Sequence, residues 1–274
     1  MIEVKSLSGV FQQIFGVDKP IIGMVHLLGL PGAPKYDSKM GIDGNLEWIM
    51  NDAANLQNGG VDGVMFCNEF DVPYAKKVGP EIVAAMTHLV SRVTEKISVP
   101  HGISVLFDFF ATIAVAKATH ADFTRVILTG AYAGDYGIMD TFGPELLRYR
   151  KAIDAENVKL FTNISGEFAA PIAPRPIELS AKGAVFVGLG DALIVQGPMT
   201  GMAPDVEDIK RVKNVVQDVP VLTGTGARTD NVANMLRYAD GAIVGTSLKV
   251  DGNTWNRVDE RRVREFMDAV KKAR

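Results

Sequence analysis

Short apolar runs alternate with amphipathic segments along the whole chain, and this alternation constrains the fold more than any other feature. The apolar runs are continuous, which is typical of parallel strands buried on both faces. They lie at 21–26, 64–67, 102–106, 123–128, 158–163 and 192–196, and two more open the stretches 220–226 and 240–249. The intervening helical segments lie at 45–58, 80–96, 110–119, 144–155, 176–183, 205–217 and 259–274. About eight strand–helix units without a linker predict a single (β/α)8 TIM barrel domain over residues 1–274.

An open doubly wound sheet is the alternative architecture. It is disfavoured because no Gly-x-Gly-x-x-Gly fingerprint follows the first strand. A short helix is predicted ahead of that strand, with Leu7, Val10, Phe11, Ile14 and Phe15 at helical spacing. We expect this helix to cover the N-terminal end of the barrel.

Length, charge and cysteine content limit the class of protein. The 274 residues suit a barrel, which typically needs about 250. A net charge of -3 without a basic block argues against nucleic acid as a partner. The single Cys67 suits a reducing compartment, no secretory signal is visible around Glu3, and no apolar run reaches about 18 residues. We expect a cytoplasmic protein with no membrane partner that forms a homo-oligomer.

Two turns rich in glycine and hydroxyl residues follow the last two predicted strands. They are Gly224-Thr225-Gly226 and Gly245-Thr246-Ser247. Glycines let backbone amides approach phosphate oxygens, and hydroxyls add donors, so we predict a phosphate site here. The alternative is that these are ordinary tight turns, which also favour glycine.

Polar residues stand at the ends of several other strands, where folding alone does not need them. In a barrel these ends meet on one face, which is where active sites lie. Asp108, His26 and Glu69 are the candidate catalytic acids and bases. The alternatives are that His26 is a structural donor and that Asp108 caps the helix at 110–119.

A second set of strand-end residues is predicted to bind substrate. It comprises Asn68, Arg125, Asn163 and Gln196. Arg125 lies within an apolar strand, so its charge needs a partner. That partner is either a carboxylate of the barrel, Glu69 or Asp108, or an anionic group of the substrate.

No cofactor is firmly indicated. Mg²⁺ could bind at Glu69 and Asp71, although the same carboxylates could accept hydrogen bonds from loop amides. No histidine or cysteine spacing indicates a metal site, and Cys67 is interpreted as a packing residue. Lys249 either adds positive charge near the phosphate or is solvated. Schiff-base chemistry is disfavoured because Lys159 lies early in its strand.

At the level of longer motifs the chain resembles the BtpA/SgcQ family over nearly its whole length. The resemblance rests on the motifs at 22–27, 30–34, 68–74, 130–135, 148–150 and 240–252, with further matches at 258–259 and 262–263. It implies a phosphate-binding-type barrel without an agreed reaction. One branch is named for a role in photosystem I assembly, and the other is associated with sugar-phosphate operons and labelled a nucleotide hydrolase. Asn68-Glu69-Phe70 places the chain closer to the second branch.

The chain departs from the photosystem branch at two places. Phe107-Asp108-Phe109 stands where that branch tends to carry Arg-Asn-Asp, and the segment 164–167 lacks its Lys-His pair. We therefore expect an enzyme that acts on a small phosphorylated metabolite, a sugar phosphate or a nucleoside-derived phosphate, as an isomerase, epimerase, aldolase or hydrolase. The alternatives are a non-catalytic metabolite-binding or assembly factor and an Mg²⁺-assisted phosphate-ester hydrolase.

Overall fold

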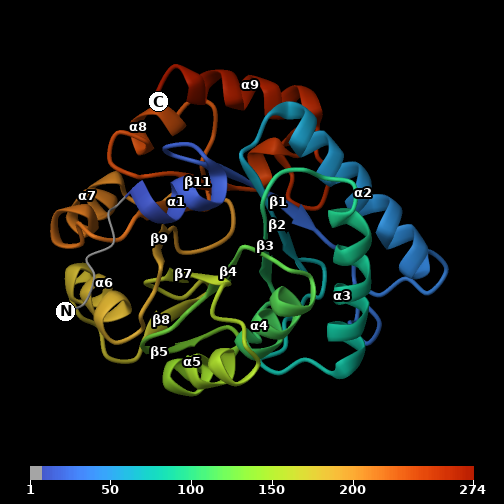
Figure 1. Ribbon diagram of the computed structural model, residues 1–274, viewed down its shortest axis with the longest axis horizontal. Coiled ribbons are helices and arrows are strands. Elements are labelled where there is room, and N and C mark those ends of the chain that lie inside the picture. Colours follow the sequence, from blue (N-terminus) through green and yellow to red (C-terminus); the bar gives the residue numbers. More distant parts are fainter. Residues whose placement is uncertain (1–7) are drawn as a thin grey trace.

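Eight parallel strands close into a barrel in the computed structural model, which describes residues 8–274 (Figure 1). The barrel strands are β1 (Ile21–His26), β2 (Gly63–Cys67), β3 (His101–Ser104), β4 (Phe123–Val126), β7 (Lys159–Asn163), β9 (Ala192–Gln196), β10 (Val221–Gly224) and β11 (Ala242–Val244). The first and last strands pair in parallel, with Ile21 opposite Ala242, and this pairing closes the cylinder. The predicted TIM barrel is confirmed.

Helices surround the barrel in the order expected from the sequence, apart from a helix of 4 residues at 232–235 that was not predicted. They are α2 (Gly41–Gly59), α3 (Pro80–Thr94), α4 (Phe109–Ala118), α5 (Gly143–Ala152), α6 (Ile177–Phe186), α7 (Val206–Val215), α8 (Val232–Met235) and α9 (Glu260–Lys271), with 3-10 turns η1 (Thr246–Leu248) and η2 (Val250–Gly252). Local chemistry sets their ends. Asp205 and Asp259 accept hydrogen bonds from first-turn amides of α7 and α9, and Gly60 ends α2 in the left-handed region. Among residues 8–274, no helix combines the length and apolarity needed to cross a bilayer.

The predicted N-terminal helix is present as α1 (Ser8–Phe15) and packs on the N-terminal end of the barrel. Phe11 and Phe15 contact the rings of Phe161 and Phe123 edge-on or tilted, and those two rings stack 4.7 Å apart inside the barrel. Leu7, which the periodicity also assigns to this helix, lies outside the described residues. Aromatic packing thus closes one end of the barrel.

Inward-facing side chains change from apolar to polar along the strands. On β1 the order is Ile22, Met24 and then His26, and on β4 Phe123 is followed by Arg125. Because side chains alternate with period two, the last inward position of each strand falls at the C-terminal end of the barrel. The N-terminal end of the barrel is filled by apolar side chains. The C-terminal end, which we call the mouth, carries the polar groups.

The segment 129–143, which lies between the apolar run 123–128 and the helical segment 144–155, contains a β-hairpin. Strands β5 (Ala131–Gly134) and β6 (Gly137–Asp140) pair antiparallel, and β8 (Ala169–Pro171) adds to the other side of β5. Strands this short show no usable periodicity, so the sequence pattern does not reveal them. The three-stranded sheet ties together the segments that leave β4 and β7 at the mouth.

Candidate active site

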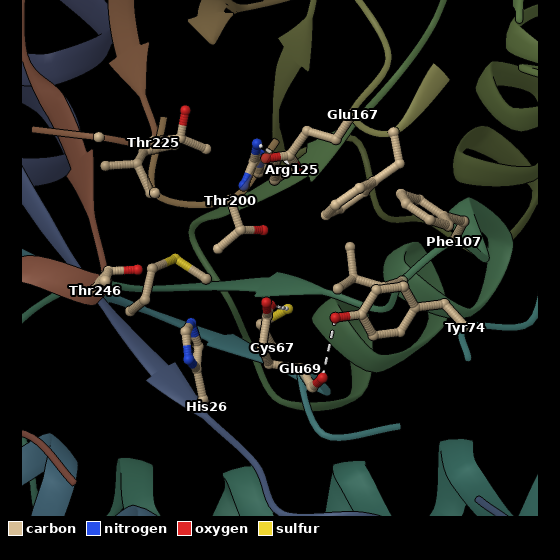
Figure 2. A pocket seen from close by; sticks show the side chains of 17 residues that line it. His26, Cys67, Glu69, Tyr74, Phe107, Arg125, Glu167, Thr200, Thr225 and Thr246 are labelled. Carbon is tan, nitrogen blue, oxygen red and sulfur yellow. Dashed lines mark hydrogen bonds and ion pairs between the residues drawn. The ribbon is translucent and has the colours of Figure 1, made fainter. Parts of the chain in front are cut away.

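A pocket opens at the mouth of the barrel, as shown in Figure 2. Polar and aromatic side chains from the segments after most of the barrel strands line it. They are His26, Cys67, Glu69, Tyr74, Phe107, Arg125, Glu167, Phe168, Thr200, Thr225 and Thr246, together with Met24, Leu106, Ile243 and three glycines. We call this the mouth pocket. Of the three predicted catalytic residues, it brings together His26 and Glu69.

Arg125 is held by three side chains on its own side of the mouth pocket. Its Nε donates to Oδ1 of Asn163 at 3.1 Å, and its Nη2 lies 3.2 Å from Oε2 of Glu167. Nη2 also donates to Oε1 of Gln196, whose own amide donates to the carbonyl of Ser165. The charge partner of Arg125 is therefore Glu167 and not Glu69 or Asp108. Asn163 and Gln196, predicted to bind substrate, hold the guanidinium and do not line the mouth pocket.

Glu69 is a buried carboxyl group that faces the mouth pocket (Figure 2). Burial is the main cause that raises its pKa to about 7, and the negative charge of Glu167 adds to the rise, while Arg125 opposes it. Its Oε2 accepts a weak hydrogen bond from the Cys67 thiol at 3.7 Å, and the hydroxyl of Tyr74 donates to its main-chain carbonyl at 3.0 Å. Glu69 can therefore hold or release a proton near neutral pH.

Cys67 itself has the properties of a packing residue. Burial raises the pKa of its thiol well above the usual range, and the charge of Glu69 acts in the same direction. The reactive form of a cysteine is the thiolate, so this side chain is unsuited to act as a nucleophile.

His26 ends β1 with its ring directed into the mouth pocket (Figure 2). It is 3% exposed, and its Nδ1 has no hydrogen-bond partner among residues 8–274. Burial lowers the pKa of His26 well below its usual value, and the positive charges of Lys249 and Arg125 lower it further. A hydrogen bond to the Thr254 backbone raises the pKa but does not offset these effects. The imidazole is thus neutral at physiological pH and leaves one ring nitrogen for a ligand.

The two predicted phosphate turns lie side by side in the lining, opposite the aromatic residues. Thr225, Gly226, Gly245 and Thr246 line the mouth pocket, whereas Gly224 and Ser247 do not. Thr225 (φ 65°) and Gly226 (φ 62°) both adopt the left-handed region. At Gly226 an added Cβ would come within 2.1 Å of the amide of Ala203, so this position requires glycine.

Two hydroxyls of these turns serve the protein itself. Thr225 Oγ1 donates to the carbonyl of Met202 at 2.6 Å and accepts from the amide of Gly197 at 3.1 Å. Ser247 Oγ donates to the carbonyl of Ala227 at 2.7 Å. The sequence prediction assigned both hydroxyls to phosphate. In the structure they hold neighbouring loops together. Thr246 Oγ1 shares a 2.7 Å hydrogen bond with Thr254 Oγ1, in which either can donate, and it keeps its own proton for an anion when Thr254 is the donor. Backbone amides and this hydroxyl are then the groups that could bind an anion.

Two predicted site residues have structural partners instead of a place in the lining. Asp108 accepts from the amide of Ala111 at 2.9 Å as the N-cap of α4, and its second oxygen accepts from the amide of Val78 at 2.9 Å. Asn68 accepts from the amide of Leu106 and donates to Asp71. Both oxygens of Asp108 are used by the backbone, so its predicted catalytic role has no support in its position, and the helix-cap alternative describes it. Asn68 is likewise a scaffold residue.

The possible metal ligand Asp71 is also committed within the protein. One oxygen accepts from the amide of Leu30 at 2.7 Å and the other from Asn68 at 2.9 Å. Across residues 8–274 no three His, Cys, Asp or Glu side chains are grouped so that they could hold a metal ion. Asp71 is therefore engaged in amide hydrogen bonds, whereas the carboxyl group of Glu69 accepts from the Cys67 thiol.

Lys249 is neither solvated nor in the mouth pocket, contrary to both expectations. It is fully buried and its Nζ lies 3.0 Å from Oδ2 of Asp52 on α2. The other oxygen of Asp52 accepts from the amide of Val258 at 2.9 Å. Lys249 follows η1, and its side chain reaches Asp52 on α2, a direction that the sequence pattern does not reveal.

Sequence reasoning missed Glu167 and an aromatic wall of the mouth pocket, formed by Tyr74, Phe107 and Phe168. Tyr74 and Phe107 pack edge to face at 5.5 Å, and Tyr136 contacts all three rings at 5.2 to 6.1 Å. The φ of Phe168 is 55°, unusual for an aromatic residue. The signal for Glu167 was its place after a strand that ends in a polar residue. The aromatic residues resembled ordinary core.

The closed parallel barrel and its polar mouth pocket define a (β/α)8-barrel protein with its candidate site at the C-terminal ends of the strands. The chain belongs to the BtpA family, whose model matches residues 17–272. It is 42% identical over 259 residues to the sgc region protein SgcQ of Escherichia coli (strain K12), covering 94% of this chain and 97% of that one. It is 35% identical to the photosystem I biogenesis protein BtpA of Synechocystis sp. (strain ATCC 27184 / PCC 6803 / Kazusa), covering 94% and 90%.

Solved structures with a similar fold are more distant in sequence. N-(5'-phosphoribosyl)anthranilate isomerase from Pyrococcus furiosus is similar with a TM-score of 0.54 and 13% identity, covering 93% of this chain and 99% of that one. A Schiff-base-forming fructose-1,6-bisphosphate aldolase is similar with a TM-score of 0.55 and 17% identity, covering 97% and 100%. At these identities the likeness is one of fold.

Proposed function

We propose that the protein is an enzyme that binds a small phosphorylated metabolite in the mouth pocket and moves a proton on it with Glu69 as general base. The observation that carries this proposal is the pKa of Glu69, about 7, at a buried carboxyl group facing the pocket. A general base works best when its pKa lies near the operating pH, because it is then both ionised and basic enough to accept a proton.

The phosphate group would lie against the turns after β10 and β11. Gly226 and Gly245 leave the backbone accessible there, and Thr246 adds a hydroxyl. His26, neutral and with a free ring nitrogen, would hydrogen-bond a substrate oxygen beside the proton that Glu69 removes. The substrates named for the two similar barrels are phosphorylated, which agrees with the proposal, although their likeness is one of fold alone.

This arrangement favours an isomerase or epimerase over the other reactions considered. No lysine stands among the described residues that line the mouth pocket, so Schiff-base chemistry has no amine there. A hydrolase built on Mg²⁺ at Glu69 and Asp71 is disfavoured because amides and Asn68 occupy the oxygens of Asp71.

A non-catalytic metabolite-binding or assembly role is the second candidate. What favours it is the relative named for photosystem I biogenesis. Proton exchange distinguishes the two functions. A panel of sugar phosphates incubated with the protein in D₂O and followed by ¹H NMR should include a compound that exchanges a carbon-bound proton. Glu69→Gln should abolish this exchange, and Glu47→Gln, at an exposed carboxylate, should retain it. Absence of exchange across the panel, together with a co-purifying protein partner, would favour the non-catalytic role.

A further inference from the structure

Glu167 carries a buried carboxylate oxygen that has no hydrogen-bond partner among residues 8–274. The other oxygen, Oε2, pairs with Nη2 of Arg125 at 3.2 Å, so the side chain is held in place while Oε1 lacks a donor. Glu167 is 6% exposed and lines the mouth pocket. A buried polar atom without a partner is destabilising, and more so when it carries charge, so an oxygen left in this state inside a pocket points to a ligand donor.

The charges around this oxygen disfavour an anionic ligand group. The ion pair with Glu167 balances the positive charge of Arg125, and Glu69 contributes a second carboxyl group to the lining. Lys249 is neutralised by Asp52 outside the pocket. Away from the two phosphate turns, the mouth pocket therefore offers two carboxyl groups and no unpaired cation among the described residues. A neutral hydrogen-bond donor fits this environment, whereas a second anion would meet repulsion.

The main chain around Glu167 is fixed, so the free oxygen has a defined position. Phe168, the next residue, donates its amide to the carbonyl of Pro198 at 3.1 Å and accepts from the amide of Asp135 at 3.0 Å. These bonds hold it at a φ of 55° with its ring in the aromatic wall. An aromatic wall beside hydrogen-bond acceptors suits the apolar C–H face and the hydroxyl edge of a polyol.

We propose that Oε1 of Glu167 accepts a hydrogen bond from a ligand hydroxyl, and that the ligand is therefore a sugar or polyol monophosphate without a second anionic group. This inference rests on the proposed phosphate site and adds the class of molecule that the phosphate belongs to. Phosphorylated carboxylic acids and bisphosphates are excluded because their second anion would face Glu167 and Glu69.

A matched pair of probes tests the proposal. Glycerol 3-phosphate and 3-phosphoglycerate share a phosphate and one hydroxyl group, and they differ at the other end, where a CH₂OH group replaces a carboxylate. Isothermal titration calorimetry should give at least roughly tenfold tighter binding of glycerol 3-phosphate to the wild-type protein. Equal affinities, or tighter binding of 3-phosphoglycerate, would overturn the proposal. Orthophosphate, titrated alone and as a competitor, reports on the phosphate turns separately.

The variant Glu167→Gln should change the preference rather than only weaken binding. Its amide can donate to a carboxylate, and Arg125 loses its counter-charge, so 3-phosphoglycerate should bind more tightly and glycerol 3-phosphate more weakly. Orthophosphate affinity should stay within about twofold. A parallel loss for both probes would indicate a merely structural role for Glu167 and overturn the proposal. Glu167→Asp, which keeps the charge, should still reject the carboxylate, and it provides the test if Glu167→Gln does not fold.

Orthophosphate binding distinguishes an error in the proposed phosphate site from an error in the role assigned to Glu167. If orthophosphate neither binds nor competes with either probe, the proposed phosphate site is wrong and the inference falls with it. If orthophosphate binds and the two probes bind equally, the phosphate site stands and the assignment of Glu167 is wrong. Glu47→Gln, remote from the pocket lining, is the control and should behave as the wild type.

Discussion

The thiol of Cys67 donates to Oε2 of Glu69 across 3.7 Å, a weak hydrogen bond to a buried carboxyl group. Glu69 is also in the field of a second carboxylate, Glu167, so the protein stabilises its neutral form. The strand end of β2 thereby holds a proton that an exposed glutamate would have lost. This arrangement costs stability at neutral pH and supplies a base at the same place.

Because the buried carboxylate of Glu69 lowers the free energy of unfolding at neutral pH, Glu69→Gln should be more stable than the wild type as pH rises. Folding raises the pKa of Glu69 from 4.5 to about 7, so the native state binds the proton more tightly than the unfolded chain. The contribution of Glu69 to the free energy of unfolding is therefore fully present below pH 4.5 and falls as pH rises to 7, by up to about 3 kcal/mol. Urea unfolding at several pH values should show that the free energy of unfolding of the variant, relative to the wild type, increases from pH 4.5 to pH 7. A difference that does not vary with pH would contradict the raised pKa.

Gly245→Ala should weaken anion binding and leave the fold intact. An added Cβ would meet Met24 and His26 at ordinary contact distances of 3.5 and 3.6 Å, so a methyl group has room at this position. The methyl group would nevertheless occupy the lining beside Thr246. Titration with orthophosphate followed by ³¹P NMR should show affinity reduced by about tenfold or more, equivalent to ~1.4 kcal/mol. Gly9→Ala, in α1 at the opposite end of the barrel, is the control and should bind as the wild type does.

The buried pair of Lys249 and Asp52 predicts strong coupling between two mutations. Lys249→Met would leave Asp52 as an uncompensated buried charge, at a cost of about 3–5 kcal/mol. Adding Asp52→Asn should restore most of that stability, because the amide oxygen of asparagine can still accept from Val258. Chemical denaturation of both single variants and the double variant gives the coupling energy. Additive losses would contradict the pairing.

Thr225→Val should release the loop that follows β9. The hydroxyl of Thr225 connects the amide of Gly197 and the carbonyl of Met202, and its loss removes two hydrogen bonds worth about 1 kcal/mol each. Hydrogen exchange measured by mass spectrometry should accelerate in peptides covering 197–203 and remain unchanged in α2. Unchanged exchange at 197–203 would show that other contacts hold this loop.

The sequence predicted the barrel because burial on both faces of parallel strands leaves a visible pattern of apolar runs. It could not predict the hairpin of β5 and β6, since four-residue strands beside the mouth are too short for periodicity to register. The strand that ends in His26 and the turns at Gly226 and Gly245 were located correctly. Which side chains at the strand ends face the ligand could not be predicted in the same way.

Asp108 and Glu167 illustrate that limit. Both are acidic residues just beyond a barrel strand, and from the sequence only Asp108 was a candidate catalytic residue. The structure uses both oxygens of Asp108 for backbone amides, while Glu167 reaches Arg125 from the segment after the neighbouring strand β7. Which of the two acidic residues faces the pocket depends on contacts between segments far apart in the chain, and no local sequence pattern indicates these contacts. Lys249 differs from its expected position for the same reason.

A crystal structure of the wild-type protein grown with millimolar orthophosphate tests the central claim most directly. We predict an anion between Gly226 and the Gly245–Thr246 segment, within hydrogen-bond distance of the backbone amides and of the Thr246 hydroxyl. A map without an anion at that position, in crystals whose mouth pocket is open to solvent, would contradict the phosphate site and with it the proposed function.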